Sequence, residues 1–115
     1  MIYTGYYYQL DKYKLLGLTP IAISGAVPTG YKGLWWKFLA PSWSIWSEYN
    51  KTKDEERYTQ RYFDEILSKL TQKDLLDKLN QYDNPILLCY EKSGFCHRHL
   101  IAEWLKFVGI ECKEF

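Results

Sequence analysis

Residues 86–99 carry the sequence Ile-Leu-Leu-Cys-Tyr-Glu-Lys-Ser-Gly-Phe-Cys-His-Arg-His, which is the most informative stretch of the chain. An apolar run typical of a buried strand ends at Cys89, and a polar loop with Gly94 leads into a helical pattern. Three basic or potentially basic side chains occupy the start of that helix, namely His97, Arg98 and His99. The unpaired N–H groups of a helix start and the helix dipole both favour negative charge. The stretch therefore predicts a site for a phosphate or carboxylate group.

The composition is that of one folded domain with a nearly balanced charge. The chain has 115 residues, of which 47% are hydrophobic, so it can form a core and is too apolar for a disordered chain. The formal net charge of +1 argues against a general nucleic-acid coat and against a polybasic membrane binder. No apolar run approaches membrane-spanning length. Three cysteines without a charged-then-apolar leader favour a cytoplasmic protein with reduced thiols.

Short apolar segments predict four strands. They are expected at residues 2–4, 19–24, 86–90 and 110–115. The stretch from 26 to 50 shows no clean period, so we expect a long loop that is either functional or partly helical, with a short helix at 33–39.

Periodic apolar positions predict three longer helices. One is expected at 55–70, and a second begins at Thr71, where Asp74 completes a capping-box pattern. The third runs from about 96 to 108 and ends at Gly109. Strands that alternate with helices predict an α/β fold, a small three-layer domain over residues 1–115 with a mainly parallel four-stranded sheet.

Several segments of the chain resemble the DUF488 family, in its short versions from bacteriophages and their hosts. The most specific is Leu-Leu-Cys-Tyr-Glu-Lys, a short loop, and then Cys-His-Arg-His-Leu-Ile-Ala-Glu-Trp-Leu, which ends at Leu105. The opening at 2–7, the segment 21–25 and the Leu-Ala-Pro at 39–41 are similar to further family motifs. Gly5 and Ser24 stand where the family often has serine and cysteine. The resemblance implies an α/β fold with a site around the cysteine-containing loop.

An anion pocket is the first interpretation of that loop. The planar guanidinium of Arg98 suits a phosphate, Lys92 can add a point charge, and His97 can donate or accept a hydrogen bond. Rings in the long loop could stack on a base, namely Tyr31, Trp35 and Trp36. Tyr3, Tyr6, Ser24 and Cys96 complete the candidate ligand-binding set, because ligands of parallel sheets collect at the carboxyl ends of the strands. The alternative is that Arg98 pairs with Glu91 or Glu103 and only holds the loop in place.

A nucleophilic cysteine is the second interpretation. A helix start and Arg98 would stabilise a thiolate at Cys89, with Glu91 and His97 as acid or base. Cys96 is expected to be the more exposed thiol. Against this, Arg98 follows Cys89 by nine positions, farther than in cysteine phosphatases, and a buried cysteine is usually a packed apolar side chain.

A zinc site is the third interpretation. Four residues of metal-ligand type fall within eleven positions, namely Cys89, Cys96, His97 and His99. No Cys-x-x-Cys pair is present, and adjacent Cys and His residues cannot easily aim at one ion. The sequence therefore predicts neither a metal nor a cofactor.

The preferred function is binding of a phosphorylated, nucleotide-derived small molecule, with sequestration of a host signalling nucleotide as its biological use. An enzyme that processes a nucleotide or nucleic-acid component at Cys89, Glu91 and His97 is the alternative. A third hypothesis is an interaction protein that associates with a second copy through the aromatic segment 31–49.

Overall fold

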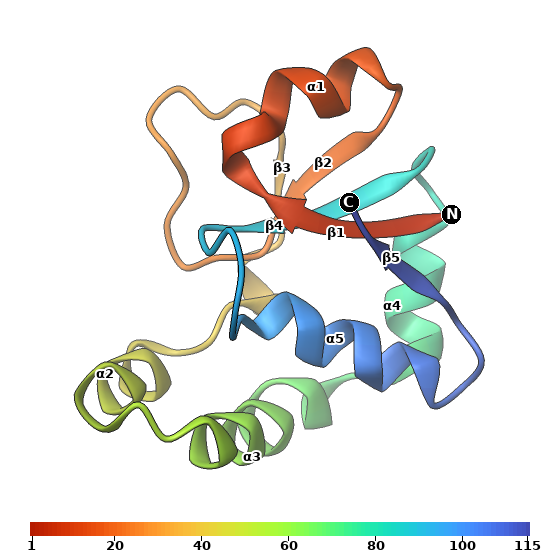
Figure 1. The fold of residues 1–115 in the computed structure, drawn as a ribbon. Helices are drawn as coiled ribbons and strands as arrows, with labels where there is room; N and C mark the ends of the chain where they lie inside the picture. The colour runs from red at the N-terminus through yellow and green to blue at the C-terminus, as the bar shows by residue number, and fades with distance from the viewer.

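A five-stranded, wholly parallel sheet forms the centre of the computed structural model, which describes residues 1–115 (Figure 1). The strands are β1 (Ile2–Tyr6), β2 (Thr19–Ala22), β3 (Leu34–Trp35), β4 (Pro85–Cys89) and β5 (Cys112–Glu114). Their order in the sheet is β3-β2-β4-β1-β5, and all four pairings are parallel. Every residue of the central strand β4 is buried, which explains its unbroken apolar sequence. The predicted α/β fold is confirmed, with one strand more than expected, because the two-residue strand β3 is too short to leave a pattern.

Five α-helices surround the sheet. They are α1 (Leu10–Leu15), α2 (Trp43–Thr52), α3 (Glu55–Glu65), α4 (Gln72–Leu79) and α5 (His97–Lys106). Short 3-10 turns occur at Tyr7–Gln9, Lys37–Leu39 and Leu67–Lys69. Figure 1 shows α1 on one side of the sheet and α3, α4 and α5 on the other, with α2 beyond the sheet next to α3.

Each side of the sheet has its own apolar cluster. Tyr7, Tyr13, Leu18, Ala22, Ile86 and Leu88 form the smaller one beneath α1. The larger one, on the side of α3 to α5, includes Ile21, Tyr62, Leu75, Leu87, Ile101 and Leu105. The alternating orientation of side chains along β4 divides its residues between the two clusters.

Local signals explain most of the helix ends. The capping box is present, because Thr71 Oγ1 accepts from Asp74 N (3.1 Å) and the Asp74 carboxylate accepts from Thr71 N. Gly109 ends the last helix with a φ of 79°, as expected. The helix predicted at 55–70 is interrupted, because the α-helix ends at Glu65 and a 3-10 turn follows.

The segment 26–50 is partly helical, which was one of the two expected alternatives, and the position of its helix α2 was not predicted. Ser42 Oγ accepts from Ile45 N (3.2 Å) and caps α2. The helix was not recognisable because Trp43 and Trp46 are exposed while Ile45 is buried, so its hydrophobic residues follow no single stripe. The expected helix at 33–39 is replaced by β3 and a 3-10 turn.

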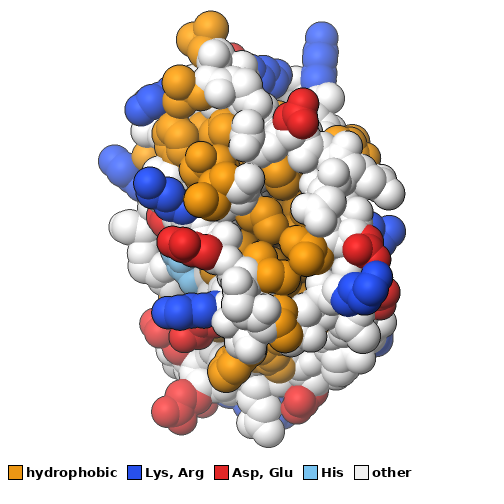
Figure 2. All heavy atoms as spheres, turned by 90° about the vertical axis from the view of Figure 1, so that its right-hand side faces the viewer, with side chains coloured by type: hydrophobic (Ala, Val, Ile, Leu, Met, Phe, Trp, Pro, Cys, Tyr) orange, Lys and Arg blue, Asp and Glu red, His pale blue; other side chains and the backbone are white.

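The amino-terminal end of the sheet presents hydrophobic side chains, which gather along the middle of the face in Figure 2. Exposed hydrophobic residues just before β1, β2 and β5 are Met1, Leu16, Phe107 and Val108. No helix has the length and apolar character needed to cross a membrane.

Candidate functional site

Arg98 lies in the first turn of α5 and is fully buried (0% exposed). Its Nε and Nη2 donate to the Glu114 carboxylate at 3.2 and 2.9 Å. Its Nη1 donates to the carbonyl of Glu91 (2.7 Å), and Nη2 also approaches the carbonyl of Lys92 at 3.5 Å. Arg98 is therefore a structural residue that ties the loop after β4 to strand β5. Its carboxylate partner is Glu114, not Glu91 or Glu103 as the sequence suggested.

The Glu114 carboxylate of this ion pair also accepts a hydrogen bond from β1. Thr4 Oγ1 on β1 donates to Glu114 Oε1 (2.5 Å), so three elements meet at one carboxylate. Partial burial alone would raise the pKa of Glu114, but the hydrogen bonds from Arg98 and Thr4 outweigh it and keep the pKa below its usual value. The carboxylate thus stays ionised and balances the buried guanidinium.

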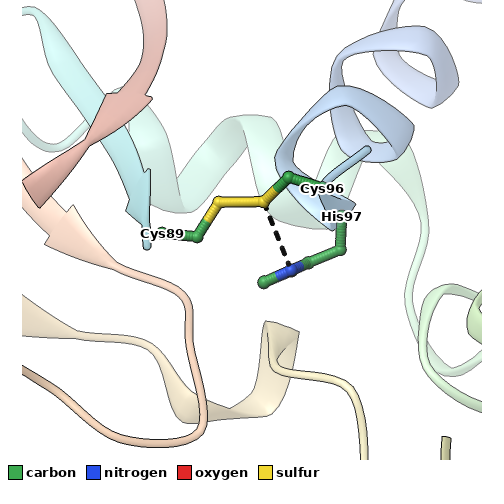
Figure 3. Close-up of side chains that lie close together, drawn as sticks. All are labelled: Cys89, Cys96 and His97. Atoms are coloured by element: carbon green, nitrogen blue, oxygen red, sulfur yellow. Dashed lines mark hydrogen bonds between the residues drawn. A yellow bond between two sulfur atoms is a disulfide. The ribbon is translucent and has the colours of Figure 1, made fainter. Parts of the chain in front are cut away.

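Cys89 and Cys96 are joined by a disulfide bond across the loop (Figure 3). Cys89 ends β4 and Cys96 is the N-cap residue of α5, and both side chains are buried. Cys96 was expected to be the more exposed thiol, but it is buried like Cys89, and the expectation of free thiols at both positions is wrong. Cys112 is the one free cysteine, and burial raises its pKa to about 11. The sequence could not reveal the pairing, because a separation of seven residues does not fix a distance.

His97 is buried beside the two sulfur atoms. Its Nε2 lies 2.7 Å from the carbonyl oxygen of Ile23, and its Nδ1 lies 3.8 Å from Cys96 Sγ. A carbonyl oxygen only accepts, so Nε2 carries the proton and Nδ1 presents a lone pair toward the sulfur. Burial lowers the pKa of His97 to about 4, so its ring is neutral at neutral pH.

At the carboxyl end of the sheet the Tyr7 ring contacts two other tyrosine rings, and Trp35 is linked to Tyr7 through Ser24. We call these four residues the edge ring cluster: Tyr7, Tyr31, Trp35 and Tyr90. The ring centroid of Tyr7 lies 5.8 Å from that of Tyr31 and 4.8 Å from that of Tyr90, both edge to face. Ser24 connects the cluster, because its hydroxyl bonds to the Tyr7 hydroxyl and its carbonyl accepts from Trp35 Nε1 (2.8 Å). Tyr90 is 52% exposed and Trp35 is 43% exposed. The cluster is thus anchored on the protein and partly exposed to solvent.

Tyrosine hydroxyls in this cluster are firmly held. Tyr31 Oη accepts from Ala22 N (3.1 Å) and donates to the Leu34 carbonyl (2.6 Å). Burial raises the pKa of both Tyr7 and Tyr31 to about 12, so these hydroxyls remain protonated donors.

The structure brings together only part of the predicted set. Ser24, Tyr31, Cys89, Cys96, His97 and Arg98 lie at or beneath the carboxyl end of the sheet. Glu91 and Lys92 are exposed on the adjacent loop. The carbonyl of Tyr6 accepts a hydrogen bond from the Tyr13 hydroxyl (3.0 Å). Tyr3 packs against Phe115, and Trp36 stacks on Phe38 away from the cluster.

Two surface depressions lie outside this cluster. One is lined by residues of the first turns of α3 together with Phe95, namely Glu55, Glu56, Thr59, Gln60 and Phe95. The other is lined by Phe38, Lys69, Leu70, Asp74, Asp77 and Lys78. The acidic lining of the first is unsuited to an anion.

The family model DUF488-N3a, described as the active DUF488-N3 subclade, matches residues 16–109. The chain belongs to the DUF488 family. The matched range of this DUF488 protein contains the disulfide, His97 and Arg98, and it stops before Glu114. Comparison with curated proteins and with solved structures gave no significant match.

Three residues that contact the candidate site or its neighbours were not among the residues predicted to bind a ligand, namely Tyr7, Tyr90 and Glu114. Tyr7 and Tyr90 follow directly after the last residues of β1 and β4, and that position was the available signal. Glu114 gave no signal, because its role depends on β5 pairing with β1.

Proposed function

We propose that this DUF488 protein binds a phosphorylated, nucleotide-derived small molecule at the carboxyl end of its sheet. The observation that carries the proposal is the edge ring cluster, in which the Tyr7 ring contacts those of Tyr31 and Tyr90, and Tyr90 and Trp35 remain substantially exposed. Aromatic faces of this kind stack on a base, and each base contributes about 1–3 kcal/mol. Tyr90 and Trp35 are the rings available for stacking.

The phosphate would lie at the loop between β4 and α5. Lys92 is exposed there, and Cys96 gives the first turn of α5 no side-chain hydrogen bond. The N–H groups of that turn and the helix dipole favour an anion. Arg98 acts indirectly in this proposal, because it holds the carbonyls of Glu91 and Lys92 and so shapes the loop.

A thermal-shift and calorimetric titration of the full chain against nucleotides and cyclic dinucleotides tests the proposal. One nucleotide class should raise the Tm, and Tyr90→Ala should weaken its binding by roughly 5- to 150-fold, from the stacking contribution of about 1–3 kcal/mol. Trp43→Ala is the matched control, because Trp43 is 77% exposed and lies on α2, outside the cluster. A flat response across the panel would refute the proposal.

A protein that binds the nucleotide and releases it chemically unchanged acts by sequestration. The ligand that it would sequester is a signalling nucleotide of the host. The binding needs only contacts and no nucleophile. Chromatography of the ligand after incubation separates this use from turnover, because a sequestering protein returns the ligand intact.

An enzyme acting on the same class of molecule is the second candidate, and a specific contact favours it. Arg98 Nη1 lies 3.0 Å from Cys89 Sγ, and such a cation stabilises a thiolate once the disulfide is reduced. The description of the matched subclade as active agrees with catalysis. Reduced protein should then convert a member of the panel, and Cys89→Ser should abolish the conversion. Full turnover by Cys89→Ser would remove the thiol from the mechanism.

A further inference from the structure

We propose that the reduced protein binds a zinc ion through Cys89, Cys96 and His97. The donor atoms are the two Sγ atoms and His97 Nδ1, and all three lie within 4.8 Å of one another. All three side chains are buried, so they meet inside the protein and not on a mobile surface. Two thiolates and an imidazole are a ligand set that zinc takes in proteins. This inference is independent of the proposed nucleotide binding.

The orientation of His97 is the second observation that points to a metal. Its Nε2–H donates to the Ile23 carbonyl at 2.7 Å, which leaves Nδ1 as the free lone pair. Metal-binding histidines usually make this kind of hydrogen bond through the nitrogen that does not bind the ion, because it fixes the tautomer and the ring plane. Figure 3 shows the imidazole turned toward the sulfur atoms.

The backbone explains how two adjacent residues can share one ion. Cys96 is extended (φ −156°, ψ 146°), whereas His97 is the first residue of α5. This change of conformation at the helix start turns both side chains to the same side. Cys96 and His97 can therefore reach one ion although they are adjacent, contrary to the expectation from the sequence.

Disulfide and zinc exclude each other, since both use the same sulfur atoms. Reduction by a phosphine supplies two electrons, water supplies the two protons, and the products are two thiols and a phosphine oxide. Zinc then displaces both thiol protons to form two zinc–thiolate bonds. The Cα atoms are 7.5 Å apart, above the range of about 4.4–6.8 Å usual for bridged cysteines. Two ligands of one ion do not require that closer approach.

The local charges agree with a bound dication. Two thiolates would neutralise its charge, and Arg98 Nη1, 3.0 Å from Cys89 Sγ, would donate a hydrogen bond to one of them. The charge of Arg98 is already balanced by Glu114, so it adds little repulsion. Three protein donors leave one coordination position for water or another ligand, as in catalytic zinc sites.

Cobalt titration of metal-free protein, reduced by a phosphine under argon, tests the inference. We expect one equivalent of Co²⁺ to bind, with the thiolate-to-cobalt absorption and the intense visible bands of a tetrahedral site, and Zn²⁺ to displace it. Cys89→Ser, Cys96→Ser and His97→Gln should each weaken or abolish the signal. Cys112→Ser is the matched control and should bind like the wild type, since Cys112 lies outside the group.

Oxidation of the wild type gives a second measurement that needs no variant. Diamide treatment should abolish cobalt binding, and reduction should restore it. The inference is overturned if the reduced wild type, folded by circular dichroism, binds no cobalt. It is also overturned if His97→Gln binds with the spectrum and affinity of the wild type. Neither result depends on whether a nucleotide binds.

Discussion

Replacing Glu114 by Gln isolates the structural role of Arg98. The substitution keeps the shape of the side chain but leaves a guanidinium with 0% exposure without its compensating carboxylate. Breaking a buried pair on one side costs about 3–5 kcal/mol, because the remaining charge stays uncompensated. Glu114 is itself 40% exposed, so water weakens the pair and the low end, about 3 kcal/mol, is the expected loss.

Urea unfolding followed by tryptophan fluorescence measures this loss directly, and the five Trp residues give a strong signal. In thermal unfolding, the Tm of Glu114→Gln should be lower than that of the wild type by roughly 10 °C, since about 1 kcal/mol corresponds to a few degrees in a domain of this size. Asp77→Asn is the control, because it removes a carboxylate from an exposed pair with Lys73 and should leave the midpoint unchanged. The reasoning is refuted if Glu114→Gln costs no more than Asp77→Asn.

The remaining predictions concern pH, packing and association. The pKa of Glu114 is lowered in the folded protein, so its contribution to the free energy of unfolding is complete above the unfolded pKa of about 4.3. This contribution is lost as the pH falls through the lower folded pKa. The stability difference between the wild type and Glu114→Gln should therefore shrink over that acid range. Gly5→Ala should destabilise by about 1–3 kcal/mol in urea unfolding, because its Cβ would lie 2.7 Å from Tyr13 Oη and 3.0 Å from Ile86 Cδ1. Tyr62→Phe should cost about 1–3 kcal/mol by the same measurement, because the Leu39 carbonyl loses a buried donor at 2.6 Å. If the exposed Trp43 and Trp46 mediate self-association, light scattering should show a larger species that the double Ala variant lacks; a monomer at all concentrations would exclude it.

The elements with long, regular patterns were predictable from the sequence. The buried strand β4, the capping box before α4 and the glycine after α5 each follow from local rules that tertiary structure did not override. Strand β3 and helix α2 were missed, because the first has two residues and the second exposes two tryptophans. Local pattern fails where an element is short or where its large side chains face solvent.

The site was predictable in position but not in detail. The strand ends correctly located Ser24, Cys89 and the loop after β4, because parallel strands end at one edge. Both Trp35 and Trp36 were expected to face a ligand, but only Trp35 bonds to Ser24, because adjacent residues of an extended chain point in opposite directions. The pairing of Arg98 with Glu114 could not be foreseen, because it depends on the register of β5 against β1.

Ligand binding at the carboxyl end of the sheet is tested most directly by native mass spectrometry. The reduced protein is first incubated with a mixture of nucleotides and cyclic dinucleotides. The wild type and Trp43→Ala should each gain the mass of one nucleotide, and Tyr90→Ala should retain far less of it. A wild type that carries no nucleotide at ligand concentrations well above those of a cell would contradict the account.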